Sequence, residues 1–366
     1  MTTDQWIDRL ETRLAAPDHK ERGRAPEPRF HTYLENLGWI QLFNYSINRF
    51  HTDPAFNLET QIRQKIFHLD HFNDDSTFGM DVSASLGMYF EYTLVGIDVQ
   101  HQDDGVPNMA HHPLQQTPDL RLLKRHDYRI SGVMPAMFRL RDALQALAKG
   151  RLSVSLPRWD RGPLDLAIQL RGYDNFVGDT MDRPEFVHAL MRFLIEERIR
   201  WWDAYLADTG ATDKAAMIAD DWINIPFISP AMFEEFVLPY YLELERYHGR
   251  TPYIHSCGDK VPVQKMLLRI KTLDTYEVNH WTSLEGTLAN LPADKFLSIS
   301  ILNSEVLLSD EAKMRRELER IATACRGRRY SVCAQAIEKL HTDMNEDISQ
   351  VQRWLRVARE VLRPTK

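Results

Sequence analysis

Phe296-Leu-Ser-Ile-Ser-Ile301 begins the stretch of sequence that decides the fold. This run and Tyr330-Ser-Val-Cys333 are short and rich in β-branched and aromatic residues, which is typical of strands. Between them, Ser309-Asp-Glu311 is a helix N-cap signal and Gly327 a stop signal, so a helix is predicted there. A strand, a helix and a second strand in this order form a βαβ unit, whose strands are parallel.

The same alternation extends through the second half of the chain. Further strands are predicted over residues 153–156, 215–219, 252–255 and 275–279, with helices over residues 182–202 and 231–247 among them. Two earlier candidate strands lie at residues 40–43 and 89–92. Six units and these two candidates make up a closed (β/α)8 barrel, an α/β TIM-barrel fold.

Domain organisation follows from length. Barrels of this type reach the size of the present 366 residues as single units, so residues 1–366 are predicted to be one domain. Residues 1–37 are predicted to be a helical extension, within an irregular N-terminal part that includes a helix at residues 58–71. The amphipathic helix at 182–202 favours a homodimer.

Composition excludes several classes of function. The 52 acidic and 45 basic residues give a net charge of −7, and no basic stripe is present, so a nucleic-acid partner is not expected. No run of 18 apolar residues occurs and the first residues do not resemble a signal peptide, so we expect a cytoplasmic protein without a membrane segment. Three cysteines are too few for a disulfide scaffold and fit a reducing compartment.

Two residues in Thr251-Pro-Tyr-Ile-His-Ser-Cys-Gly-Asp259 point to a metal site. Residues i and i+2 of a strand share a face, so His255 and Cys257 project together. Cys333 lies on the last predicted strand, and one His with two Cys leaves zinc an open fourth position, as a catalytic zinc needs. The alternative reading is that these thiols are small core hydrophobes.

Four segments also resemble a known family: Gly162-Pro-Leu-Asp-Leu-Ala-Ile-Gln-Leu-Arg-Gly172, Ile218-Ala-Asp-Asp-Trp222, residues 228–239 and Ile254-His-Ser-Cys-Gly-Asp259. In this order they resemble the uroporphyrinogen decarboxylase superfamily, and within it the zinc-dependent cobamide (corrinoid) methyltransferase branch. The resemblance implies a barrel with its active site at the C-terminal mouth. It also implies that zinc is bound by His255, Cys257 and a last-strand cysteine, for which Cys333 is the candidate.

The resemblance leaves two points open. Glu277 and His280 are alternative third ligands, since the family's last ligand tends to sit slightly beyond the position of Cys333. The decarboxylase activity itself is not expected, because the Arg-Gln-Ala-Gly-Arg run that carries the decarboxylase's arginine cradle is missing from this chain.

Polar residues at strand ends are candidates for the remaining site roles. We expect catalytic roles for Asp220, Asp221 and Glu277. Substrate-binding roles are predicted for Trp222, Tyr253, Asn279, His280, Asn303 and Gln335.

The resemblance, together with the His255 and Cys257 pair, implies an enzyme, a methyltransferase with zinc and a corrinoid (methylcobalamin) as cofactors. A methyl group would pass between a small thiol, methoxylated or methylated substrate and the corrinoid, which a separate corrinoid protein supplies because the Asp-x-His-x-x-Gly pattern of a cobalamin domain is absent. The alternatives are a zinc-dependent thiol alkyltransferase that opens an epoxide without cobalamin, and a non-catalytic barrel that binds a tetrapyrrole.

Overall fold

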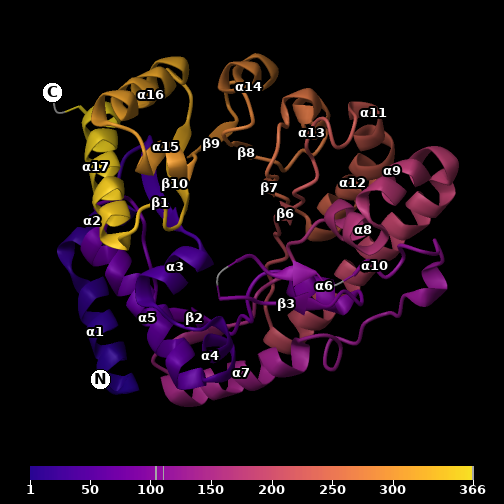
Figure 1. Ribbon diagram of the computed structural model, residues 1–366, viewed down its shortest axis with the longest axis horizontal. Coiled ribbons are helices and arrows are strands. Elements are labelled where there is room, and N and C mark those ends of the chain that lie inside the picture. Colours follow the sequence, from indigo (N-terminus) through magenta and orange to yellow (C-terminus); the bar gives the residue numbers. More distant parts are fainter. Residues whose placement is uncertain (104, 110, 365–366) are drawn as a thin grey trace.

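Eight parallel strands form the centre of the computed structural model, which describes residues 1–103, 105–109 and 111–364. They are β1 (Arg29–Leu34), β2 (Asp81–Ser83), β5 (Ser153–Ser155), β6 (Ile218–Ala219), β7 (Tyr253–His255), β8 (Thr275–Val278), β9 (Phe296–Ile301) and β10 (Tyr330–Ile337). Six of them pair in the order β1-β10-β9-β8-β7-β6, and β2 pairs with β5. The helices surround this ring in chain order (Figure 1), so the predicted (β/α)8 barrel is confirmed.

The longer helices connect the strands on the outside of the ring. The helices are α1 (Thr3–Ala15), α2 (Pro17–Gly23), α3 (Asn36–Phe43), α4 (Ile47–Thr52), α5 (Pro54–His71), α6 (Phe90–Leu94), α7 (Met134–Ala148), α8 (Pro163–Arg171), α9 (Tyr173–Asp182), α10 (Pro184–Thr209), α11 (Pro230–Met232), α12 (Leu238–His248), α13 (Gln264–Leu267), α14 (Leu284–Asn290), α15 (Asn303–Leu307), α16 (Glu311–Ala324) and α17 (Met344–Leu362). A π-helical turn, Phe233–Val237, precedes α12, and β3 (Val99–Gln100) pairs antiparallel with β4 (Asn108–Met109).

Local sequence explains where the helices begin and which face they bury. The carboxylate of Asp310 caps α16 by accepting a hydrogen bond from the backbone N–H of Lys313 (2.7 Å). In α17, Ile348, Val351 and Leu355 are buried at helical spacing, so one face packs on the barrel. Among the described residues, none of the helices is long and apolar enough to cross a membrane.

The barrel strands alternate between two environments. In β9, Leu297, Ile299 and Ile301 are buried in the core shared with the helices, while Phe296, Ser298 and Ser300 face the barrel interior and are only half-buried. β1 shows the same alternation. The interior is therefore not filled by the bulky side chains usual in such barrels.

Two neighbouring strand pairs are not joined by a regular ladder. Between β5 and β6, Ala219 exchanges backbone hydrogen bonds with Asp160 and Gly162 (2.8 and 2.7 Å). Between β1 and β2, the backbone N–H groups of Phe30 and Thr32 on β1 donate to the carboxylates of Asp75 and Asp74 (both 2.9 Å). Side-chain carboxylates therefore occupy hydrogen-bonding positions on β1 that a neighbouring strand would otherwise take.

The N-terminal strands were predicted wrongly. Residues 40–43 belong to α3 and residues 90–92 to α6, whereas the first two barrel strands are β1 and β2. Because His31 and Tyr33 point inward, β1 has no continuous apolar run, while the apolar run at 40–43 belongs to a helix. The helical extension is also shorter than predicted, since β1 begins at Arg29.

Candidate metal centre

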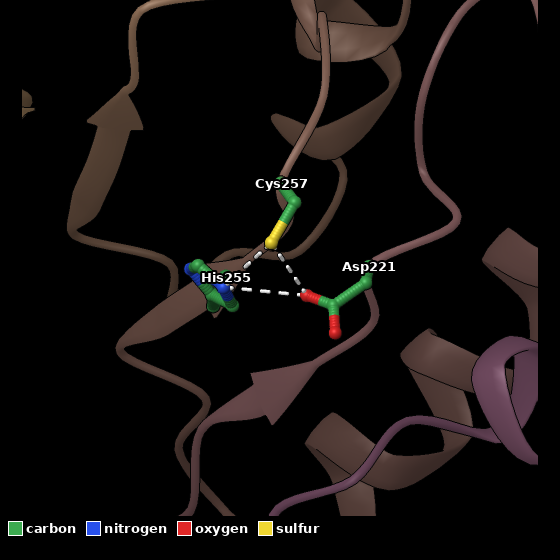
Figure 2. A group of neighbouring side chains, drawn as sticks. All are labelled: Asp221, His255 and Cys257. Atoms are coloured by element: carbon green, nitrogen blue, oxygen red, sulfur yellow. Dashed lines mark hydrogen bonds and ion pairs between the residues drawn. The ribbon is translucent and has the colours of Figure 1, made fainter. Parts of the chain in front are cut away.

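Three side chains converge at the C-terminal ends of β6 and β7. His255 is the last residue of β7, Cys257 follows two residues later, and Asp221 lies two residues beyond β6. One ligand atom from each lies within 4.8 Å of the others. Figure 2 shows the three side chains pointing toward one another. We call them the ligand triad.

The spacing of the ligand triad fits a tetrahedral zinc ion. Asp221 Oδ1 lies 3.3 Å from His255 Nε2 and 3.2 Å from Cys257 Sγ, and the imidazole nitrogen and the sulfur are 3.5 Å apart. With zinc bonds of about 2.0–2.3 Å, tetrahedral ligands are separated by about 3.3–3.8 Å, so the three atoms would have to move apart by only a few tenths of an ångström. Imidazole, thiolate and carboxylate are all zinc ligands, and three of them leave a fourth position open.

The backbone that presents Cys257 is fixed by its neighbours. Asn279 Nδ2 donates to the carbonyls of Ser256 (2.7 Å) and Gly258 (3.2 Å). A Cβ atom on Gly258 would lie 1.8 Å from Cγ of Asn224, so only glycine fits there. Asn279, predicted to bind substrate, therefore braces the Cys257 loop.

Glu277 lies behind His255 and orients its ring. Its Oε1 is 2.9 Å from His255 Nδ1, and its Oε2 accepts a hydrogen bond from Lys260 Nζ (2.5 Å). Burial raises the pKa of Glu277, but Lys260 and His255 outweigh burial and bring the pKa to about 2. The carboxylate therefore stays ionised and holds Nδ1 of His255, which leaves Nε2 directed at Asp221 and Cys257.

Arg161 holds Asp221 in a similar way. Its Nη1 donates to Asp221 Oδ2 (2.9 Å) and Asp165 Oδ2 (2.5 Å), and its guanidinium lies over the ring of Tyr89. Burial raises the pKa of Asp221, but His255 and Arg161 together keep the pKa well below its ordinary value. Oδ2 is thus engaged by Arg161, and Oδ1 is the oxygen presented to His255 and Cys257.

Without a metal, the other two residues of the ligand triad, His255 and Cys257, are protonated. Burial lowers the pKa of His255, but hydrogen bonds to the three groups around its ring outweigh burial and raise the pKa to about 12. Desolvation raises the pKa of the Cys257 thiol, with Asp221 adding to the effect and His255 opposing it. A metal ion entering this site must displace both protons.

The family model for uroporphyrinogen decarboxylase (URO-D) matches residues 77–351. The chain belongs to the uroporphyrinogen decarboxylase family. Among solved structures, it is similar to a methyltransferase from Methanosarcina mazei, with 14% sequence identity, a TM-score of 0.66, and coverage of 96% of this chain and 98% of that chain. No curated protein matches the chain.

Cys333 does not join the ligand triad of this URO-D family member. In the described part of the chain, the group of three ligand atoms within 4.8 Å consists of Asp221, His255 and Cys257. Cys333 is buried on β10 and lines the barrel interior, in register with Ser300 and His31. The geometry thus places Asp221, and not Cys333, beside His255 and Cys257, and the ligand role of each of these residues stays a prediction.

Asp220 also lies elsewhere than predicted. It is fully buried beneath the site and accepts hydrogen bonds from the backbone N–H groups of Leu164 and Asp165 (3.2 and 2.5 Å) at the start of α8, and from the Tyr241 hydroxyl (2.5 Å). A Cβ on Gly162 would lie 2.2 Å from its Oδ2. Asp220 therefore anchors α8 and is not placed to touch a substrate.

The remaining predicted residues divide into two groups. Tyr253 and Gln335 line the barrel interior together with His255 and Glu277. The others lie on the rim of the mouth: Trp222 is stacked on Tyr173 with ring centroids 5.2 Å apart, His280 is exposed beside Trp281, and Asn303 begins α15.

Sequence reasoning missed Arg161, Lys260 and Tyr241. Each acts by pairing with a carboxylate from another element, and nothing in its own sequence neighbourhood marks that partner. The ligand triad residues themselves were all candidates, although Asp221 was assigned to catalysis.

Proposed function

We propose that this protein is a zinc-dependent methyltransferase that moves a methyl group between a small substrate and a corrinoid carried by a partner protein. The observation that carries the proposal is the convergence of Asp221, His255 and Cys257 at the mouth of a URO-D family barrel. A methyltransferase of similar fold over nearly the whole chain supports it.

In this proposal Asp221, His255 and Cys257 would hold the zinc ion. Zinc in such a site is a Lewis acid that deprotonates a thiol or polarises an ether oxygen at its open position. The Glu277 carboxylate keeps the proton of His255 on Nδ1, so that the lone pair of Nε2 is free to bind the metal. Arg161 fixes the Asp221 carboxylate and balances its charge.

Substrate and partner would approach this site from two sides. The interior of the barrel below His255 contains a cavity of about 960 Å³, large enough for a small organic molecule. The Cys257 side chain is exposed at the mouth above it. A substrate in the cavity would thus present its reacting atom at the mouth, where a corrinoid on another protein can reach it.

The cavity is unsuited to uroporphyrinogen itself. A substrate with many carboxylates needs several cationic side chains to bind it. Arg29 and Lys65 are the Arg and Lys residues among those that line the cavity, and Lys65 is already ion-paired with Asp81 (3.1 Å). This charge distribution supports methyl transfer over decarboxylation of a polycarboxylate.

The test compares wild-type protein with Cys257→Ser, and uses Cys325→Ser, a buried cysteine at the end of α16, as the matched control. Zinc per chain is measured by elemental analysis, and methyl transfer is measured with methylcobalamin as surrogate donor and with added thiols. We expect zinc and turnover to be lost in Cys257→Ser and kept in Cys325→Ser, since serine stays protonated and binds zinc poorly.

Other outcomes would replace the proposal. Full zinc content and activity in Cys257→Ser would mean that this cysteine is no ligand. Alkylation of a thiol by an epoxide without cobalamin would instead identify a thiol alkyltransferase. A protein without zinc or turnover would leave only a binding function.

A further inference from the structure

The cavity beneath His255 is lined by small hydroxyl-bearing side chains where a barrel of this type normally has bulky ones. Ser298 and Ser300 of β9 and Ser331 of β10 all face it. Ser298 is in register with Glu277 on one side and Ser331 on the other. The hydroxyl groups therefore belong to strands two and three places from β7 in the sheet and face the cavity that His255 also lines.

Aromatic side chains supply the apolar part of the same cavity. Tyr253 and Phe296 line it from β7 and β9, and Trp39 and Phe78 from the segments that follow β1 and precede β2. Such a lining, apolar with a few fixed polar groups, is typical of sites for small organic molecules.

The charged groups that line the cavity are already neutralised or engaged. Lys65 Nζ donates to the Gly79 carbonyl (2.9 Å) and is paired with Asp81. The carboxylate of Glu277 is paired with Lys260, and that of Asp75 with Arg363.

The other two histidines and the arginine of the lining are likewise neutral or bound to other groups of the protein. His68 is paired with Asp74 (2.9 Å), and burial lowers the pKa of His31, which keeps it neutral. Nη2 of Arg29, the first residue of β1, donates to the backbone carbonyls of Arg22 and Asp75 (3.0 and 2.8 Å), and Arg29 is in register with Ser331 of β10.

We propose that the substrate is an uncharged molecule with an apolar body and two or more hydroxyl or ether oxygens, and that its body lies among Ser298, Ser300 and Ser331. The inference rests on the proposed function and names the substrate class of that site. A carboxylate of an anionic substrate would lose its hydration among these serines, and the neighbouring cation, Arg29, already donates its Nη2 to two backbone carbonyls. A neutral oxygen needs only the hydroxyl donors and acceptors present there.

The test uses two probes with one skeleton, 4-methoxybenzyl alcohol and 4-methoxybenzoate, titrated calorimetrically into zinc-loaded protein without cobalamin. We expect the alcohol to bind at least tenfold more tightly than the benzoate. Ser298→Leu and Ser300→Leu, which fill the cavity, should each weaken binding of the alcohol at least tenfold. Ser300→Ala, which removes only a hydroxyl, should weaken it by about two- to tenfold.

Ser349→Leu is the control, because Ser349 is exposed on α17, and it should bind the alcohol like the wild type. Circular dichroism and zinc content show that each variant is folded. The inference is overturned if the benzoate binds as tightly as the alcohol, if neither probe binds, or if the folded leucine variants bind normally.

The two proposals fail in different ways. Selective binding of the alcohol without methyl transfer to or from cobalamin would preserve the substrate class and refute the proposed function. Methyl transfer together with preference for the benzoate would preserve the function and refute the substrate class.

Discussion

Glu277→Gln tests whether the buried carboxylate behind His255 tunes the candidate metal centre. Glu277 and Lys260 are an almost fully buried pair, with side chains 1% and 3% exposed and a hydrogen bond of 2.5 Å between them. Glutamine keeps the shape but leaves the Lys260 ammonium without a counter-charge, which costs about 3 kcal/mol of stability. Loss of the charge next to Nδ1 also makes His255 a weaker ligand, and we expect zinc affinity to fall by about 10–100-fold.

The assay separates these two effects. Urea unfolding of the metal-free protein gives the stability change, and competition with a chelator gives the zinc affinity. In the double variant Glu277→Gln/Lys260→Met the unpaired charge is gone, so stability should largely recover while zinc affinity stays low. If the double variant recovers zinc affinity as well, or if Glu277→Gln binds zinc like the wild type, Glu277 does not act through His255.

Three further predictions concern the ligand triad and its loop. Asp221→Asn should lower zinc affinity by about 100-fold or more. Cys333→Ser should retain a full equivalent of zinc, measured by elemental analysis. The reverse result would identify Cys333 as the third ligand. His255 (pKa raised to about 12) and Cys257 (pKa raised) are protonated in the metal-free site, so binding of zinc should release about two protons. The logarithm of the zinc affinity should therefore rise by about two per pH unit between about pH 6 and 8. Calorimetry in buffers of different ionisation enthalpy counts the released protons, and release of none would contradict the site. Gly258→Ala should lower the thermal midpoint and zinc content together, because its Cβ would overlap a neighbouring side chain; a variant with unchanged melting and zinc would show that the loop can adjust.

Sequence alone predicted the strands β5 to β10 from their short apolar runs, and β6, β7 and β10 each follow a predicted helix with a clear start or stop signal. It failed for β1, since a strand with polar residues on its inner face lacks the apolar run by which buried strands are recognised. His255 and Cys257 were found because the period of a strand fixes which residues share a face. The depth of Cys333 in the barrel depends on register between distant strands, which spacing along the chain does not give.

The carboxylates that hydrogen-bond to β1 also bear on solubility. A strand edge with unpaired N–H groups is a template on which another chain can add a strand and aggregate. On β1, the N–H groups of Phe30 and Thr32 are occupied by Asp75 and Asp74, which belong to the same chain. Burial raises the pKa of Asp74, but its hydrogen bonds, led by that to His68, outweigh burial and keep the pKa below its ordinary value. Because the pKa of Asp74 lies below that of an ordinary carboxylate, the N–H group of Thr32 stays bound to an ionised carboxylate at pH values at which ordinary carboxylates have begun to take up protons.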